Sequence, residues 1–355
     1  MIRVLIAEDS ATTLELLSAM LQSDPEIQVV GWAKNGVEAV ALTKTVRPDL
    51  VVMDVHMPVL DGFGATRQIM LEWPTPIIIV SATVDVKAVD VALHALKLGA
   101  LTLLEKPAGP QAENFPESCE RFIATVRAMS AVKVVRRWVN GSSSVSPPDA
   151  ALAPRGAPHI NAIAASTGGP AALLRVLSDL PEPLPVPVLI VQHMAPGFVA
   201  GLASWLSDST SRRVKVAEPD ERLADGVIYL APDDRHLGLF DRRTLQVSDT
   251  PRCGGFRPSG TVLFESVAQV YGSSAVGVIL TGMGEDGCLG LTALRRAGGR
   301  IIAQDESTSV VFGMPAAAIA AGLVDATLPI HLVGSRLQAW LGGNVRLRNT
   351  KGSER

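Results

Sequence analysis

Three residue types that together perform acyl transfer follow separate apolar runs in the second half of the sequence. Ser166 comes after "HINAIAA", His193 after "VPVLIVQ", and Asp286 lies in "TGMGEDG" after "AVGVIL". In an open parallel sheet, ligands bind at the edge where the carboxyl ends of the strands meet. A serine can attack a carbonyl there, a histidine can take its proton, and an aspartate can hold the imidazolium. The sequence therefore predicts a serine-dependent acyl-transfer site.

Small residues follow the serine directly. Thr167, Gly168 and Gly169 let a substrate carbonyl approach the backbone, and unpaired N–H groups at the start of the next helix can stabilise an oxyanion. Pro170 fits the first helical turn, where its missing N–H costs nothing. No G-x-S-x-G elbow is present, and the order Ser, His, Asp differs from that of α/β-hydrolases. The sequence thus predicts a related chemistry on a different fold.

Other roles remain open for these residues. Ser166 could cap the helix, or "STGG" could bind a phosphate at a helix N-terminus, although the loop lacks the lysine of a Walker A sequence. His236, in "APDDRHL", is a weaker candidate for the base because it starts a strand pattern. Glu285 neighbours Asp286, and composition does not choose between the two carboxylates.

A second group of polar residues follows the apolar runs of the first half. Glu8 and Asp9 end the first run, Asp54 the third, Ser81 the fourth and Lys106 the fifth. Three carboxylates at one edge repel each other unless a cation lies between them, and an all-oxygen set suits Mg²⁺. Asp54 can then attack a phosphoryl group whose oxygens contact Ser81 and Lys106. Helix capping could explain any one of these residues taken alone, but it explains five polar residues at four strand ends poorly.

The elements that must position these residues are strands alternating with helices. This alternation predicts two open, doubly wound, mostly parallel sheets covered by helices on both faces. In "GLFDRRTLQVSD" the Asp-Arg-Arg turn predicts a β-hairpin appended to the second sheet. The predicted strands are "RVLIAED", "IQVVGWA", "DLVVMD", "TPIIIVS" and "LTLLEKP" in the first half, and "HINAIAAS", "VPVLIVQH", "GVIYLAP", "AVGVILTG" and "RIIAQD" in the second.

A segment of linker composition divides the chain. At 355 residues the sequence exceeds what a single core usually supports. In residues 141–158, 14 of 18 are Gly, Ser, Pro or Ala, which is typical of a linker that is part flexible and part extended. We expect domains at 1–140 and 159–345, separated by this linker and followed by a polar tail at 346–355.

The overall composition excludes several classes of protein. Apolar residues make up 47% of the chain and charged residues 19%, a globular composition without a run of 18 apolar residues. The N-terminus does not resemble a secretory signal, and the three cysteines, Cys119, Cys253 and Cys288, fit no metal spacing. A net charge of -3 gives no general attraction to nucleic acid or anionic lipid. We expect a cytoplasmic protein that does not insert into membranes.

The first 124 residues or so resemble a response-regulator receiver domain. The resemblance implies a flavodoxin-like sheet of order 2-1-3-4-5, phosphorylation of Asp54, and Mg²⁺ held by Glu8, Asp9 and Asp54. Leu103 stands where receivers often have an aromatic residue, whose rotation is part of the usual switch after phosphorylation. This departure affects the expected rotation and leaves the expected phosphorylation unchanged. The matching features are the Glu8-Asp9 pair, "MDVHMPVLDG" around Asp54, "VSAT" with Ser81 and "EKPA" with Lys106.

Residues from about His159 to Leu341 resemble the catalytic domain of chemotaxis protein-glutamate methylesterases, the CheB family. The shared stretches are "ASTGGP", "VQHM", "LAPDDRHL", "RPS", "TGMGEDG" and "FGMPAAAIAAGLVD". The resemblance implies that Ser166 is the nucleophile, His193 the general base and Asp286 the orienting acid. It also implies that Thr167 and the backbone around Met283 shape the pocket and the oxyanion site.

The same resemblance implies an activity and partners. It implies hydrolysis of glutamate γ-methyl esters, and deamidation of certain glutamines, on the cytoplasmic helices of chemoreceptors, through an acyl-serine intermediate and without a cofactor. A chemotaxis histidine kinase would be the phosphodonor, and we expect a monomer. Our regulatory hypothesis is that the receiver inhibits the esterase until Asp54 is phosphorylated. The alternatives are a receiver-linked esterase or scaffold with a non-chemotaxis target, and a DNA-binding regulator, against which the large apolar second half argues.

Three departures from the family pattern lie near the predicted site. Ala164 stands where the family commonly has Gly, and Gly260-Thr261 replaces a hydrophobic residue followed by Asp. Asp233-Asp234 replaces a more usual Gly pair. None of them changes the three predicted active-site residues. They could instead alter the substrate preference or the way in which the two domains fit together. Sequence alone gives no physical account of Ala164.

Overall fold

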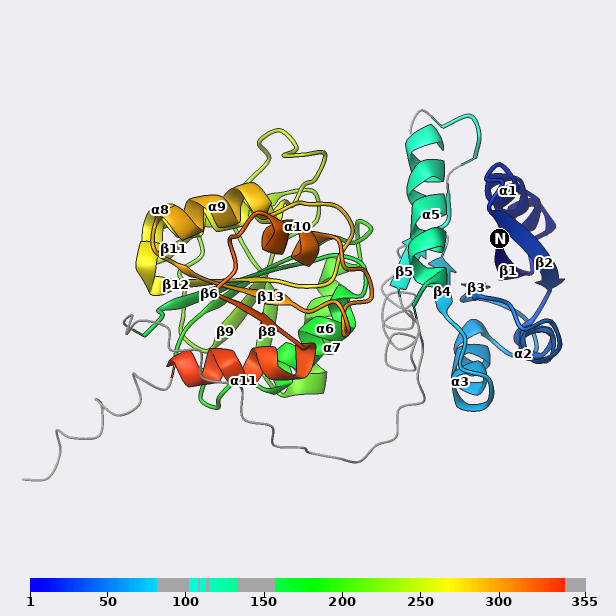
Figure 1. Cartoon of the computed structure of the whole chain (residues 1–355), viewed down its shortest axis with the longest axis horizontal. Helices are drawn as coiled ribbons and strands as arrows, with labels where there is room; N and C mark the ends of the chain where they lie inside the picture. Colours follow the sequence, from blue (N-terminus) through cyan, green and yellow to red (C-terminus); the bar gives the residue numbers. More distant parts are fainter. Residues whose placement is uncertain (82–101, 108, 113–114, 133–156, 342–355) are drawn as a thin grey trace, which may run out of the picture. The chain divides into compact units, whose positions relative to one another are not determined.

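The structure, a computed structural model, describes residues 1–81, 102–107, 109–112, 115–132 and 157–341. The chain separates into two compact units, Met1–Gly141 and Ser142–Arg355 (Figure 1). Most of the expected linker and the whole expected tail at 346–355 lie outside the described residues, as does the side chain of Leu103.

The first unit is a five-stranded parallel sheet in the order β2-β1-β3-β4-β5, which confirms the predicted order. Every residue of β3 and β4 is buried, as in parallel strands covered on both faces. Ser10, Asn35 and Asp61 begin helices by accepting an N–H of the first turn. The elements are β1 (Ile2–Ala7), α1 (Ala11–Gln22), β2 (Ile27–Ala33), α2 (Gly36–Val46), β3 (Leu50–Asp54), α3 (Gly62–Glu72), β4 (Ile77–Ser81), β5 (Thr102–Glu105) and α5 (Phe115–Ser130).

The second unit is built on a seven-stranded sheet in the order β14-β13-β12-β6-β7-β9-β8, in which every pairing is parallel. The doubly wound parallel architecture predicted for this half is therefore confirmed. Its strands are β6 (Ile160–Ala165), β7 (Val188–Gln192), β8 (Arg213–Val216), β9 (Val227–Leu230), β12 (Ala275–Ile279), β13 (Arg300–Gln304) and β14 (Ala326–Leu328). Its helices are α6 (Gly169–Ser178), α7 (Val199–Thr210), α8 (Gly260–Tyr271), η1 (Gly272–Ser274), α9 (Cys288–Arg296), α10 (Met314–Ala320) and α11 (Ile330–Leu341).

Two strands and the place of the hairpin differ from the sequence prediction. The edge strands β8 and β14 were not predicted, because they have only four and three residues and no long apolar run. The predicted hairpin forms from β10 (His236–Asp241) and β11 (Thr244–Ser248). It makes a separate two-stranded sheet and does not extend the larger one.

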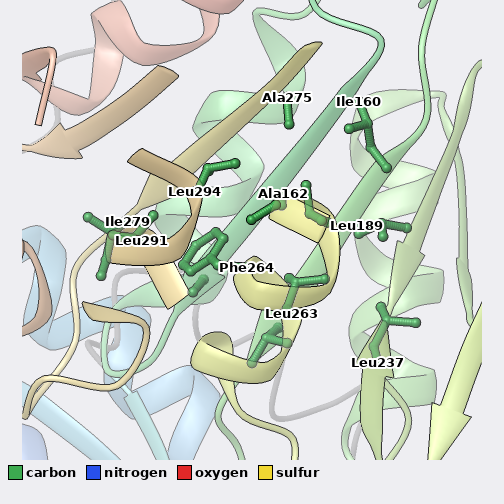
Figure 2. Close-up of a cluster of buried hydrophobic side chains, with 14 of the residues drawn as sticks. Ile160, Ala162, Leu189, Leu237, Leu263, Phe264, Ala275, Ile279, Leu291 and Leu294 are labelled. Atoms are coloured by element: carbon green, nitrogen blue, oxygen red, sulfur yellow. The ribbon is translucent and has the colours of Figure 1, made fainter. Parts of the chain in front are cut away.

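The hydrophobic core of the second unit lies between the sheet and helices α8 and α9 (Figure 2). Ile160, Ala162 and Ala164 alternate along β6 so that one face of the strand enters this core. Phe264 and Leu291 enter it from the two helices. In Figure 1, α6, α7 and α11 lie on the other side of the sheet. No described helix has the length and apolar character needed to cross a bilayer.

The strand order places a topological switch beside β6. From β6 the chain continues to β7 on one side of the strand and later returns to β12 on its other side. The loops that leave β6 and β12 therefore diverge over the carboxyl edge of the sheet, and ligands of open α/β sheets bind in such a crevice.

Candidate active site and acidic cluster

Ser166 lies in the turn between β6 and α6. Its N–H donates to the Thr281 carbonyl at 3.0 Å, which ties the turn to the loop after β12. Gly168 has a φ of 79°, and a Cβ there would lie 2.5 Å from Cβ of Val310, so only glycine fits. Gly168 is the N-cap of α6, and no side chain caps this helix. The alternative in which Ser166 serves as a helix cap is therefore wrong.

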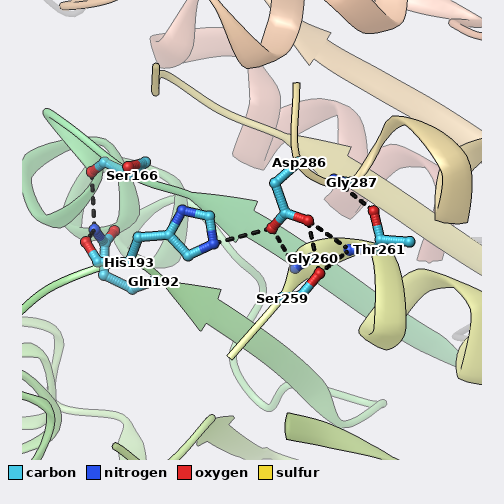
Figure 3. Close-up of polar contacts among 8 residues, drawn as sticks. All are labelled: Ser166, Gln192, His193, Ser259, Gly260, Thr261, Asp286 and Gly287. Carbon is cyan, nitrogen blue, oxygen red and sulfur yellow. Dashed lines mark hydrogen bonds and ion pairs between the residues drawn. The ribbon is translucent and has the colours of Figure 1, made fainter. Parts of the chain in front are cut away.

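His193 follows β7 and faces the carboxyl group of Asp286 (Figure 3). The imidazole Nε2 lies 2.9 Å from Oδ2 of Asp286. One ring face stacks on Phe256, with the ring centroids 4.3 Å apart and the planes 8° from parallel. The other nitrogen, Nδ1, is buried and has no hydrogen-bond partner within the described part of the chain. In Figure 3 this edge of the ring lies on the side of Ser166.

The Asp286 carboxylate is held at the N-terminus of helix α8. The Ser259 hydroxyl donates to its Oδ1 at 2.6 Å, and the Gly260 N–H donates to its Oδ2 at 2.6 Å. Burial alone would raise the pKa of Asp286, but His193, Ser259 and the Gly260 N–H together lower it to about 2. A helix N-terminus favours the same charge. The carboxylate is therefore ionised at neutral pH although it is buried.

Ser166 is not hydrogen-bonded to His193, although the structure brings the two residues to adjacent loops. Among the described residues, no partner is found for the Ser166 hydroxyl. The two residues are joined indirectly, because the Gln192 amide donates to both of their carbonyl oxygens at 2.8 Å. The glycine at position 169 leaves room for this amide, since a Cβ there would lie 1.9 Å from Oε1 of Gln192 and would displace it. Contacts between nucleophile and base are often loose before substrate binds.

The predicted oxyanion residues lie around Ser166. A Cβ on Gly282 would lie 2.7 Å from Cβ of Ser166, so this glycine allows the loop after β12 to pass close to the serine. The next residue, Met283, has a side chain that is 44% exposed. Within the described part of the chain, the N–H groups of Thr167 and Met283 have no acceptor. These donors are available for the oxygen of a substrate carbonyl.

The two alternatives left open by the sequence lie elsewhere. His236 is buried, and its Nε2 lies 3.2 Å from the carbonyl oxygen of Pro251. Glu285 is exposed, and the carboxylate that contacts His193 belongs to Asp286. The geometry thus favours His193 and Asp286 over both alternatives.

Sequence reasoning missed three residues that contact the site. Gln192 and Ser259 stand within the quoted stretches "VQHM" and "RPS", but the strand-end rule selects only the residue that follows a strand. Phe256 lies in a loop distant in sequence from His193, and only the folded chain brings their rings together. An aromatic residue beside two glycines, in a chain with 4% aromatics, was the available signal.

The departures at Ala164 and Gly260 are explained by their mutual contact. A Cβ on Gly260 would lie 2.9 Å from Cβ of Ala164 and 3.2 Å from Oδ2 of Asp286. Two Cβ atoms cannot lie so close together, because non-bonded carbons repel strongly at less than about 3.5 Å. The side chain of Ala164 on β6 therefore occupies the space that a side chain at position 260 on α8 would need. Each residue departs from the family pattern in the direction that accommodates the other.

Gly260→Ala is expected to destabilise the second unit by about 1–3 kcal/mol, the usual cost of overpacking. Adding Ala164→Gly should recover most of this loss, because it removes the atom that collides. Denaturant unfolding of the two single variants and the double variant measures the coupling free energy. Strictly additive effects would show that the two positions do not compensate.

In the first unit, three carboxylates gather at the carboxyl edge of the sheet. Oxygens of Glu8, Asp9 and Asp54 lie within 4.8 Å of one another. Lys106 Nζ lies 2.7 Å from Glu8 and 3.0 Å from Asp54. Burial acts to lower the pKa of Lys106, but the two carboxylates outweigh it and raise that pKa. Ser81 ends β4, and its carbonyl accepts the Lys106 N–H at 2.8 Å.

The donor set of this cluster fits a hard divalent cation. All three side chains offer oxygen, which Mg²⁺ prefers. Burial, the largest cause, and the charge of Asp54 raise the pKa of Glu8, while Lys106 opposes them. A cation among the carboxylates would act in the same direction as Lys106 and favour their ionised forms.

Comparison with known proteins identifies both domains. Residues 161–337 match the family model described as CheB methylesterase, and residues 4–113 match the response regulator receiver domain. The crystal structure of the CheB methylesterase catalytic domain of Thermotoga maritima is similar, with a TM-score of 0.50 and 37% identity. It covers 51% of this chain and 98% of that chain.

Curated relatives align along nearly the whole sequence. A protein named protein-glutamate methylesterase/protein-glutamine glutaminase 3, from Anaeromyxobacter dehalogenans, is 50% identical over 343 residues, which are 96% of this chain and 99% of the relative. One numbered 4, from Myxococcus xanthus, is 47% identical over 97% of this chain and 98% of the relative. The chain therefore belongs to the CheB family of protein-glutamate methylesterases/protein-glutamine glutaminases, with a response-regulator receiver domain in front of the methylesterase domain.

Proposed function

We propose that this chain is a phosphorylation-regulated protein-glutamate methylesterase and protein-glutamine glutaminase that acts on methylated chemoreceptors. The observation that carries the proposal is the 2.9 Å contact between His193 Nε2 and the buried Asp286 carboxylate, beside Ser166. A base that is held by an ionised acid next to a free serine hydroxyl is the arrangement needed for acyl transfer.

The proposed reaction begins with Ser166. Its Oγ attacks the γ-carbonyl carbon of the glutamate ester, and His193 Nδ1 takes the hydroxyl proton. The N–H groups of Thr167 and Met283 stabilise the oxyanion, while Gly168 leaves room for the carbonyl. The Nε2–H of His193 donates a hydrogen bond to the Asp286 carboxylate, which stays ionised and stabilises the imidazolium.

The tetrahedral intermediate then collapses. The bond to the methoxy oxygen breaks, His193 returns the proton to it, and methanol leaves. Water, deprotonated by His193, hydrolyses the acyl-serine to the free carboxylate. With a glutamine the leaving group is ammonia, so the same three residues serve both reactions.

The first unit supplies the regulation. We assign Asp54 as the phosphoacceptor, Glu8, Asp9 and Asp54 as residues that would hold Mg²⁺, and Ser81 and Lys106 as contacts of the phosphoryl oxygens. Bound Mg²⁺ neutralises charge on the transferring phosphoryl group. A chemotaxis histidine kinase is the proposed phosphodonor. We further propose a monomeric, cytoplasmic protein with a receiver at 1–140, a linker at 141–158, a catalytic domain at 159–345 and a tail at 346–355.

The function is tested by release of methanol from membranes that carry methylated chemoreceptor. The full chain should release methanol in proportion to enzyme and time, and ammonia from a receptor with glutamine at the modified positions. Hydrolysis of small esters without any release from receptor would instead support an esterase with a non-chemotaxis target. A chain inactive on both would contradict the proposal.

Phosphorylation of Asp54 is expected to raise kcat/KM for the receptor between about 10-fold and 100-fold. To move the equilibrium between inhibited and active states from 1:99 to 99:1, phosphorylation would have to favour the active state by about 10⁴-fold. A phosphoryl group brings only about -1.5 to -2 charges, so we expect it to supply only part of that preference. The measurement is methanol release with and without a small-molecule phosphodonor and Mg²⁺, with Asp54→Asn as the control. An equal rate with and without the phosphodonor, in chain shown to be phosphorylated, would exclude receiver inhibition.

A further inference from the structure

We propose that Asp234 is a positioning residue for the His193 ring, acting through Arg257 and Phe256. The inference rests on the proposed role of His193 as general base. It gives a role to one of the two aspartates that replace a more usual glycine pair in this chain.

The contact that reaches His193 is made by Phe256. The two rings are stacked nearly parallel, with 4.3 Å between centroids. A flat apolar surface on one face of the imidazole restricts rotation of the ring, and so keeps Nε2 at Asp286 and the Nδ1 edge toward the serine. Positioning of this kind contributes to rate because the reacting groups must be held in a narrow range of geometry.

The loop that carries Phe256 is built as a tight turn. Cys253 and Phe256 exchange both backbone hydrogen bonds at 3.0 Å. Between them Gly254 and Gly255 both have positive φ, 58° and 86°, as in a type I′ turn. The turn is closed by its own two hydrogen bonds, so its place over His193 depends on what holds its two ends.

Asp234 holds both ends of this turn. Its Oδ1 accepts a hydrogen bond from Arg252 at 2.8 Å, and both carboxylate oxygens accept from Arg257, at 3.1 and 2.7 Å. Arg257 also donates to the carbonyl of Asp249 at 2.8 Å. The two arginines flank the turn in sequence, and the paired contact with Arg257 has the geometry that gives arginine–carboxylate pairs their strength.

The backbone conformation of Asp234 allows a substitution that removes its carboxylate alone. Its φ is 48°, in the left-handed region that glycine adopts freely and Asp or Asn tolerates. Asp234→Gly therefore removes the carboxylate without adding backbone strain. Asp220 provides a matched control, because it has a φ of 56° and an exposed side chain, and no partner of its carboxylate is found among the described residues.

The neighbouring Asp233 contacts the loop that follows His193. Its Oδ2 accepts the Gly197 N–H at 2.8 Å, in the loop that leaves His193. The two aspartates thus bind the loop after β7, which carries His193, and the loop before α8, which carries Phe256. Asp233 is half-buried, and we restrict the test to Asp234, whose replacement disturbs packing least.

Asp234→Gly is expected to lower kcat for receptor demethylation about five-fold, with KM within two-fold of wild type, since an arginine–carboxylate network at the surface has a modest effect. Asp234→Asn should retain part of the activity, because its amide oxygen still accepts from one arginine. Asp220→Gly should match wild type. A small ester should show the same five-fold loss, because ring position affects every substrate, whereas a receptor-docking role would spare it.

A double-variant cycle tests the route through Phe256. Phe256→Leu keeps apolar volume but removes the stacked ring, so adding Asp234→Gly to it should cause no further loss. The inference would be overturned if Asp234→Gly still lowered kcat five-fold in the Phe256→Leu background. It would also be overturned if Asp220→Gly lowered kcat as much as Asp234→Gly does. These outcomes differ from failure of the proposed function, in which wild type itself releases no methanol.

Discussion

Replacing Ser166 with alanine is expected to reduce methanol release from methylated receptor by about 10³-fold or more. Removing the nucleophile of a serine hydrolase removes the acyl-enzyme route, and only binding and oxyanion stabilisation remain to act on the ester. The loss should fall on kcat, because the hydroxyl has no role in holding the substrate before it reacts. Single-turnover and steady-state measurements of released methanol separate an effect on kcat from an effect on substrate binding.

Stability should be unchanged in this variant, which is what makes the experiment informative. Ser166 does not cap α6, and its backbone contacts to Thr281 and Gln192 do not involve the side chain. Ser178→Ala, at the other end of the same helix, is the matched control, since it removes a hydroxyl that donates to the Leu174 carbonyl at 2.7 Å. Undiminished release by folded Ser166→Ala protein would refute the nucleophile assignment.

The strands and the residues at their ends were accessible to sequence reasoning because both follow from local patterns. A run such as "VPVLIVQ" is a buried strand in a parallel sheet, and the residue after it lies at the ligand-binding edge. This is how His193 was found, and β7 ends directly before it. The short edge strands β8 and β14 have no such run, so only their pairing with neighbours defines them.

Contacts between distant segments were not accessible in this way. Ala164 and Gly260 look like unrelated departures until the fold places a Cβ on one within 2.9 Å of the other. The same is true of Asp234, whose arginine partners lie in a later loop. Packing and ion pairing depend on the relative placement of elements, and one sequence carries no record of that placement.

Asp286→Asn is expected to lower kcat by about 10³- to 10⁴-fold, with folding retained at neutral pH. The carboxylate receives the Gly260 N–H and lies 2.9 Å from His193 Nε2, both on Oδ2. An asparagine has a single acceptor oxygen. With that oxygen at the Oδ2 position its NH₂ group faces the Ser259 hydroxyl, and with the NH₂ group at the Oδ2 position it faces both the Gly260 N–H and the ring. If it faces the ring, Nε2 must accept and the proton moves to Nδ1, which is the wrong tautomer for a base at Ser166.

The same substitution should remove a pH dependence of stability. The pKa of Asp286 is lowered from 3.8 to about 2 by folding, so its contribution to the free energy of unfolding is fully present above about pH 4 and is lost as the pH falls through 2. A pKa shift of this size corresponds to about 2 kcal/mol of the free energy of unfolding. Denaturant unfolding between pH 2 and pH 7 should therefore show a steeper acid loss in wild type than in Asp286→Asn. Parallel curves would mean that Asp286 is not held as an anion by His193 and the start of α8, and the imidazole would then lack the charge that orients it.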